Sequence, residues 1–418
     1  MRTSKVLKFL TTLGVVLTLV GAQAAAQEIV LTWPCIWVGG DAKAAPVKEI
    51  VDAFNAANVG KIRVDIEAQP NYDAYEQKIR TSLAAGTSPG DIFTFKLNPA
   101  TSEFYKSPLV MDFSKDLTGT WAKSFPAASI KQATIKGQLK SLPFEVGVTP
   151  VWYNMALLKK AGVTKVPATS AEFWAAADKL KALGISPIAQ NTGGTNAYIT
   201  MLWFTQIAAT RGGENVWSKP ITDPVFVESL KDLKKMFSYA NVDSVGAAPA
   251  IANGHFLKEE SAIYSNGSWR LAPSEKDGPA VFSNLAFDYL PSFGTYKNSV
   301  PMFLQAMLAA GETKDPARRA AIITFLKVLT SPDSVKKISL ASGAMFTVPF
   351  TFQAATPVEK GMQRFMDLVQ KASFTVPNLE VALGPAAVAE FGQLISKYVA
   401  GETTEADMLK AIAKKLED

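Results

Sequence analysis

Aromatic side chains and turn-borne polar groups gather where the predicted strands end. Their positions are Trp33 with Trp37, Phe95 with Asn98, residues 152–154 (WYN), Tyr198 with Trp203, and residues 266–270 (NGSWR). Flat aromatic faces suit the C–H faces of a sugar ring, while amide, carboxylate and hydroxyl groups reach its hydroxyls. Core packing is the alternative for any single tryptophan, so it is the shared location that indicates a ligand site.

Catalytic chemistry finds little support in this chain. One cysteine, Cys35, excludes an internal disulfide framework, and one histidine, His255, excludes a His-pair zinc site. The chain has no Gly-x-Ser-x-Gly elbow, no phosphate loop ending in Gly-Lys-Ser/Thr and no His-Glu-x-x-His. We therefore expect no enzyme activity, no catalytic residue, no metal site and no cofactor.

The elements that must position these residues alternate between strands and helices. Apolar runs at residues 29–33, 62–66 and 91–95 predict strands, and a helix is predicted to begin near Pro46. Val47, Ile50, Val51 and Phe54 recur at the spacing of one buried helix face. The repeated strand–helix–strand unit indicates an α/β fold and favours a mostly parallel sheet. Ligands of such sheets bind at the carboxyl ends of strands, where the aromatic groups lie.

The first 26 residues have the layout of a cleavable secretory signal peptide. Arg2, Lys5 and Lys8 precede a 12-residue apolar core, and residues 21–26 (GAQAAA) are mostly small. Twelve apolar residues are too few for a helix to cross a hydrocarbon core of about 30 Å. Removal of this leader lowers the formal charge from +6 to +3, which argues against a nucleic-acid partner. Cys35 follows Trp-Pro, which disfavours a lipoprotein, so we expect a soluble periplasmic protein.

Several motifs, in order, resemble the extracellular solute-binding proteins of sugar-type ABC importers, the family related to maltose-binding proteins. They are GQLKSLPF (137–144), VWYN (151–154), AGV (161–163) with AEF (171–173), YSNGSW (264–269), DPARRA (315–320), SPD (331–333) and SG (342–343). Looser matches are SLAAG (82–86) with DI (91–92), and AGE (400–402) with LK (409–410). Each motif is degenerate, but the ordered set covers nearly the whole chain after the leader.

This resemblance implies a particular division of the chain. It implies two α/β lobes joined by a three-strand hinge, as in type II periplasmic binding proteins, that close on a ligand. Lobe one would comprise residues 28–143 and 306–342, and lobe two residues 149–300 and 349–418. The crossovers are expected near residues 144–148, 301–305 and 343–348. The implied partners of this monomer are a mono- or oligosaccharide and the membrane permease of an ABC importer.

The resemblance also transfers roles to individual positions. Trp269 matches the family's sugar-stacking tryptophan, Glu145 a hinge acid that can reach the ligand, and Tyr198 an aromatic of the second lobe. Phe95 lies where relatives can carry a first-lobe tryptophan. Further expected ligand contacts are Trp33 or Trp37 at the first strand exit, Asn98, Trp203, and Phe303 and Gln305 at the middle crossover.

Two alternatives stay open at this point. One is a binding protein for a polyamine, a metal complex or a phosphate ester; Arg270, next to Trp269, is the one feature suggesting an anion. The other is an exported carbohydrate-active enzyme, which would need two carboxylates at a set separation that a sequence does not reveal.

Overall fold

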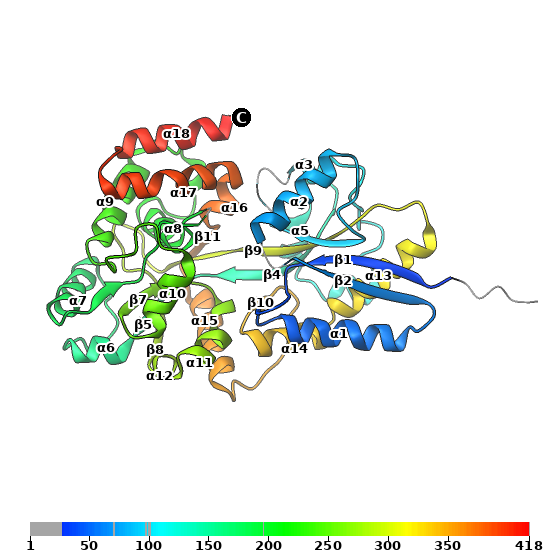
Figure 1. The fold of residues 1–418 in the computed structure, drawn as a ribbon, viewed down its shortest axis with the longest axis horizontal. Coiled ribbons are helices and arrows are strands. Elements are labelled where there is room, and N and C mark those ends of the chain that lie inside the picture. The colour runs from blue at the N-terminus through cyan, green and yellow to red at the C-terminus, as the bar shows by residue number, and fades with distance from the viewer. Residues whose placement is uncertain (1–26, 70–71, 97, 99–101, 195, 418) are drawn as a thin grey trace, which may run out of the picture.

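The chain folds into two α/β lobes that lie side by side and are connected by long strands (Figure 1). The computed structural model describes residues 27–417 except 70–71, 97, 99–101 and 195. The predicted signal peptide, residues 1–26, lies outside the described residues. Among the residues described, no helix combines the length and the apolar character needed to cross a membrane.

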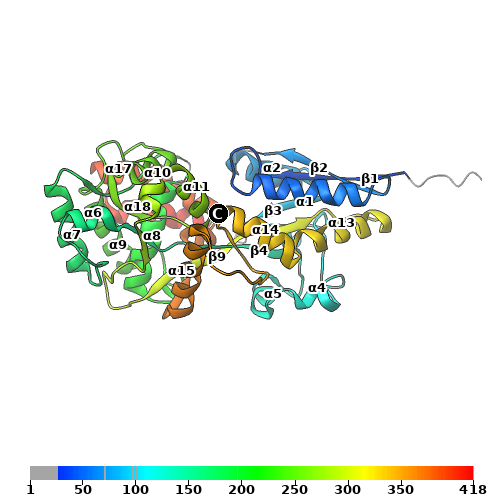
Figure 2. The same cartoon turned by 90° about the horizontal axis from the view of Figure 1, so that it is seen from below.

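Lobe one is built around β1 and its parallel partner β2. Its elements are β1 (Ile29–Cys35), α1 (Ala44–Ala57), β2 (Ile62–Ala68), α2 (Tyr72–Ala84), β3 (Ile92–Phe95), α3 (Ser102–Lys106), α4 (Gly119–Lys123), α5 (Ala127–Ala133), α13 (Pro316–Leu329) and α14 (Pro332–Ser342). The apolar face predicted for α1 is confirmed, since Val47, Ile50, Val51 and Phe54 are all buried. Figure 2 shows α1 running alongside β1 and β2, with α13 and α14 next to it.

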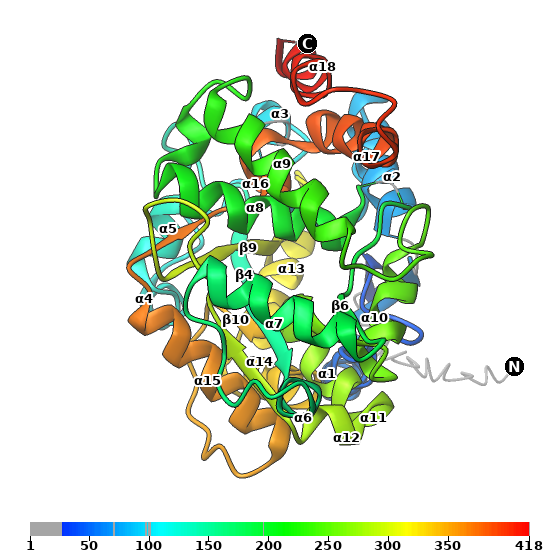
Figure 3. The ribbon, with the colours of Figure 1, turned by 90° about the vertical axis from the view of Figure 1, so that its left-hand side faces the viewer.

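Lobe two contains a four-stranded sheet in the order β6-β7-β5-β8, surrounded by helices. Its elements are β5 (Val151–Asn154), α6 (Met155–Lys160), α7 (Ser170–Ala182), β6 (Ser186–Ile188), α8 (Tyr198–Gly212), α9 (Pro224–Phe237), α10 (Pro249–Leu257), β7 (Ser261–Ser265), α11 (Leu271–Asp277), α12 (Pro279–Phe282), β8 (Leu285–Asp288), α15 (Pro357–Lys371), β11 (Phe374–Val376), α16 (Leu379–Leu383), α17 (Pro385–Ala400), α18 (Glu405–Glu417) and two short 3₁₀ helices, η2 (Val216–Ser218) and η3 (Ser268–Arg270). Figure 3 views the molecule from this end, with α17 and α18 toward one edge and α15 toward the opposite one.

Three strands lie between the lobes: β4 (Leu142–Val148), β9 (Ser299–Ala310) and β10 (Met345–Phe346). The central one, β4, pairs with β10 on one side and with β9 on the other. The longest, β9, begins beside β11 of lobe two, continues beside β4 and ends beside β3 of lobe one. The crossovers predicted near residues 144–148, 301–305 and 343–348 overlap these strands in sequence, and their role as a hinge stays a prediction. Because they share hydrogen bonds, the three strands form one sheet in the hinge.

The expectation of a mostly parallel sheet is wrong. Parallel pairing links β1 to β2, β6 to β7 and β9 to β11, whereas β3, β4, β5 and β10 form antiparallel pairs. The physical reason is the discontinuous topology. A chain that leaves a lobe and later returns inserts its new strand from the opposite direction, and local strand–helix–strand patterns do not reveal this.

Candidate functional site

A cavity of about 270 Å³ lies between the two lobes and against the hinge strands β4 and β9. Lobe one contributes the loop after β1, the residue after β2 and the residue after β3, while lobe two contributes the start of α8 and η3. Strands β4 and β9 form the floor. The lining residues are Ile36, Trp37, Asp41, Lys43, Gln69, Lys96, Glu145, Tyr198, Trp269, Gln305 and Ala306.

Lobe two supplies an aromatic wall, formed by Trp269 and Tyr198. Their ring centroids lie 6.4 Å apart with an interplanar angle of 52°, and both side chains are half-buried. The Trp269 ring covers Gly267, where a Cβ atom would lie only 2.3 Å from it. Glycine at this position therefore lets the indole fold back along its own loop and present a face to the cavity.

The loop that carries Trp269 is fixed by buried hydrogen bonds. The Asn266 side-chain oxygen accepts from the Gly267 amide at 2.8 Å, and the Trp152 indole donates to the Asn266 carbonyl at 2.9 Å. Trp152 belongs to β5 and is fully buried. The central sheet of lobe two thus sets the position of the indole before any ligand arrives.

Tyr198 is the first residue of α8 and stands just after a left-handed Ala197 (φ 46°). The Asn191 side chain accepts from the Ile199 amide at 3.0 Å and anchors this end of the helix. Burial raises the pKa of Tyr198 well above its ordinary value, so its hydroxyl stays protonated. In the described structure this buried hydroxyl has no hydrogen-bond partner, and neither has the side-chain oxygen of Gln305 across the cavity floor. Two such groups in one cavity are suited to a polar ligand.

Lobe one and the hinge supply charged groups. The Lys43 ammonium lies 3.4 Å from Glu145 and 3.6 Å from Asp41. Glu145 is 3% exposed, and the pairing register between β4 and β9 shifts on both sides of it. Such an irregularity re-aims a side chain that regular pairing would direct elsewhere.

The electrostatics of this group follow from burial. Desolvation raises the pKa of Glu145, and the nearby Lys43 ammonium only partly opposes it. Desolvation would lower the pKa of Lys43, but the carboxylates of Glu145 and Asp41 outweigh it, so the pKa of Lys43 rises and the ammonium persists.

The family model for bacterial extracellular solute-binding proteins matches residues 49–364. This chain belongs to that family. A probable sugar-binding periplasmic protein of Mesorhizobium japonicum is 29% identical over 216 residues, which are 47% of this chain and 48% of that protein. The diacetylchitobiose binding protein of Streptomyces coelicolor is 24% identical over 338 residues, 78% of this chain and 74% of that protein. The first of these matches thus spans only about half of its relative.

Solved structures of low sequence identity share the fold of this solute-binding protein. A chitin oligosaccharide binding protein superposes with a TM-score of 0.83 at 20% identity, covering 93% of this chain and 98% of that one. A maltose-bound protein of T. maritima has a TM-score of 0.76 at 18% identity, covering 94% of this chain and 99% of that one. The two-lobed fold is therefore that of the type II periplasmic binding proteins.

The structure brings five of the residues expected at the ligand site to one cavity. They are Trp37, Glu145, Tyr198, Trp269 and Gln305, which come from both lobes and from the hinge. Of the two tryptophans at the first strand exit, Trp37 lines the cavity. Trp33 instead packs edge-on against Phe325 in the core of lobe one, with centroids 5.6 Å apart.

The other residues expected at the ligand site do not line this cavity. Phe95 packs against Phe104 in lobe one, and Trp203 is fully buried in α8. Phe303 covers Gly147 in the hinge, where a Cβ atom would lie 2.6 Å from its ring. Asn98 is buried and Arg270 half-buried, and neither lines the cavity.

Sequence reasoning missed four polar lining residues, Asp41, Lys43, Gln69 and Lys96. A signal was present, because all four follow β1, β2 or β3 along the chain, and strand ends are where a ligand is expected. Phe95 and Lys96 illustrate the error: adjacent residues of an extended segment point to opposite sides, so only one of them reaches the cavity.

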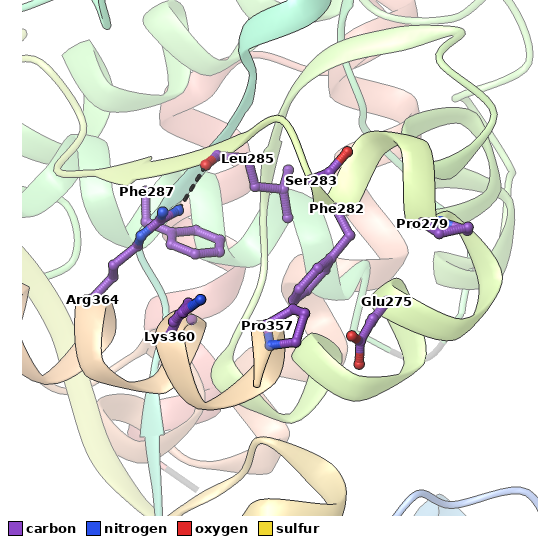
Figure 4. A pocket seen from close by; sticks show the side chains of 10 residues that line it. Glu275, Pro279, Phe282, Ser283, Leu285, Phe287, Pro357, Lys360 and Arg364 are labelled. Carbon is purple, nitrogen blue, oxygen red and sulfur yellow. Dashed lines mark hydrogen bonds between the residues drawn. The ribbon is translucent and has the colours of Figure 1, made fainter. Parts of the chain in front are cut away.

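A second cavity, of about 330 Å³, lies within lobe two between α12, β8 and α15 (Figure 4). Phe282, Phe287 and Pro357 contribute apolar surface, and the Arg364 guanidinium donates to the Leu285 carbonyl at 3.0 Å. None of its lining residues belongs to the other lobe. It therefore offers no surface on which the two lobes could close together.

Proposed function

We propose that this solute-binding protein captures a mono- or oligosaccharide between its lobes and delivers it to the permease of an ABC importer. One observation carries the proposal: the aromatic wall of Trp269 and Tyr198 lines the same cavity as charged and amide side chains from the other lobe and the hinge. An aromatic wall opposite dense hydrogen-bonding groups suits a sugar, which has apolar faces and polar edges. The relatives named for sugars and chitin oligosaccharides support the same assignment.

The proposed mechanism is closure around the ligand. A sugar that stacks on Trp269 and also reaches Lys43 and Glu145 contacts both lobes only in the closed form. Because such a ligand has a higher affinity for that form, it shifts the equilibrium toward it. Bending at β4, β9 and β10 would move lobe one (residues 28–143 and 306–342) relative to lobe two (residues 149–300 and 349–418).

The cellular setting is part of this proposal. We place the chain in the periplasm as a monomer without a nucleic-acid partner, exported by a signal peptide at residues 1–26. Cys35 is 1% exposed within β1, which supports a protein that carries no lipid on this cysteine. We propose a binding protein without enzyme activity, in keeping with relatives that are named as binding proteins.

Titration calorimetry with the purified protein tests the assignment. The panel contains diacetylchitobiose, maltose, xylobiose, raffinose and galactose, with spermidine and glucose 6-phosphate representing the alternative ligand classes. We expect saturable binding of at least one neutral sugar and a raised melting temperature in its presence. Binding of spermidine or glucose 6-phosphate alone would overturn the sugar assignment, and a new product on a chromatogram would overturn the non-enzymatic role.

A further inference from the structure

A buried ion pair connects the two lobes at the edge of the sugar cavity. Lys96 lines the cavity, and its ammonium lies 2.9 Å and 2.7 Å from the two carboxylate oxygens of Glu380. Each side chain is only 7% exposed. Lys96 follows β3 of lobe one, whereas Glu380 belongs to α16 of lobe two, so the pair exists only when the lobes approach each other at this point.

Glu380 is held firmly in lobe two. The Asn378 side chain accepts from the Val381 amide at 3.0 Å, and the Leu379 amide donates to the Thr205 hydroxyl at 3.2 Å. Thr205 lies in α8, the helix whose first residue, Tyr198, forms part of the aromatic wall. The carboxylate of Glu380 is therefore positioned by the same helix that presents Tyr198 to the ligand.

The pair changes the charge that a ligand meets. Around the cavity, Asp41, Glu145 and Glu380 provide three carboxylates, and Lys43 and Lys96 provide two ammonium groups. Each ammonium already contacts at least one carboxylate. A ligand with a carboxylate of its own would have to displace Glu380 from Lys96 and leave one buried carboxylate without its cation, which is strongly unfavourable.

We propose that Glu380 is a specificity-determining residue that excludes sugar acids from the cavity by neutralising Lys96. The proposal rests on the proposed sugar-binding function and narrows it to uncharged sugars. Glu380 itself does not line the cavity, so it acts on the ligand through the ammonium of Lys96. Loss of its charge would leave a lysine at the cavity edge that attracts an anion.

Glu380→Gln tests the proposal, with diacetylchitobiose as the neutral probe and the glucuronate–N-acetylglucosamine disaccharide of hyaluronan as the acidic probe. The readout is the ratio of the two affinities by calorimetry, because any general weakening of closure affects both probes. We expect this ratio to shift at least about tenfold toward the acidic probe, since a supplied carboxylate restores the charge-assisted contact. An unchanged ratio would overturn the proposal.

Three further variants sharpen the result. Lys96→Met combined with Glu380→Met removes both charges, so the ratio should return to that of the wild type. Glu49→Gln removes a carboxylate from the exposed pair with Lys337 and should leave the ratio unchanged. Should Glu380→Gln fail to fold, Glu380→Asp shortens the side chain and draws its carboxylate away from Lys96, so it should give an intermediate shift. A wild-type ratio for this variant would equally overturn the proposal. Absence of binding by the wild type to every neutral sugar would instead overturn the proposed function, and this inference with it.

Discussion

The two walls of the interlobe cavity are built from different chemistry. Lobe two presents the half-buried rings of Trp269 and Tyr198. Lobe one presents Asp41, Lys43 and Lys96, whose charges are paired, beside Trp37, which is only 2% exposed. Aromatic surface contributes affinity roughly in proportion to the apolar area it buries. Paired charges add less net attraction, but they penalise any ligand that leaves one of them without a partner. The aromatic wall should therefore govern how tightly a ligand binds, and the charged wall which ligand is accepted.

The largest expected effect comes from removing the aromatic wall. Trp269→Ala should weaken binding of the best sugar in the panel by about tenfold or more, because the stacking surface is lost. Calorimetry on the folded variant measures this. Trp121→Phe is the matched control: this tryptophan is buried in lobe one, where its indole donates to the Thr330 hydroxyl at 2.9 Å, and it does not line the cavity, so the melting temperature should fall while the affinity stays the same. Equal affinities for Trp269→Ala and the wild type would remove Trp269 from the site.

A smaller effect should follow from displacing the ring without removing it. In Gly267→Ala the new methyl group would meet the Trp269 ring at 2.3 Å, so the indole must swing away from its resting position. We expect about fivefold weaker binding and a changed tryptophan fluorescence spectrum, since preorganised stacking is lost. Gly254→Ala in α10 is the control, because a methyl group there would meet open space. Wild-type affinity in Gly267→Ala would show that the ring position seen here is not the binding position.

Tyr198→Phe separates the ring of the aromatic wall from its hydroxyl. The buried hydroxyl has no partner in the described structure, so its removal should leave the ligand-free protein at least as stable as the wild type. Sugar affinity should fall about threefold, the size expected for one neutral hydrogen bond. The control, Tyr105→Phe, removes a hydroxyl that donates to the Ala133 carbonyl at 2.7 Å. It should lower stability and leave affinity unchanged, and the reverse pattern would contradict the role of Tyr198.

The smallest expected effect concerns pH and the charged groups. Burial raises the pKa of Glu145 above its ordinary value of 4.5. At pH values just above 4.5, the folded protein therefore binds more protons at this position than the unfolded chain does. Where the folded state binds more protons than the unfolded chain, the free energy of unfolding falls as the pH rises. Glu145→Gln should abolish this decline, so thermal melts from pH 4.5 upward should show the variant gaining stability relative to the wild type. Glu49→Gln, at an exposed carboxylate, should run parallel to the wild type, and the same result for Glu145→Gln would contradict the prediction.

Much of the fold could be predicted because it depends on local patterns. The apolar face of α1 was predictable from the spacing of Val47, Ile50, Val51 and Phe54, and the structure buries all four. The strand directions were not, because β9 pairs with strands from both lobes over twelve residues. Pairing across crossovers depends on residues far apart in the chain, and no local window contains both partners.

At the site, the sequence alone determined which types of residue we expect to contact the ligand and that they lie at strand ends. It indicated aromatic and polar groups at strand ends, and it named Trp269, Tyr198 and Glu145, which the structure brings to one cavity. Only the tertiary structure decided which neighbour faces inward: Trp37 instead of Trp33, and Lys96 instead of Phe95. The reason is geometric. Side-chain direction alternates along an extended segment, and pairing, bulges and packing against the other lobe select the register. The contact between Lys96 and Glu380, 284 residues apart, likewise depends on how two separately built lobes meet.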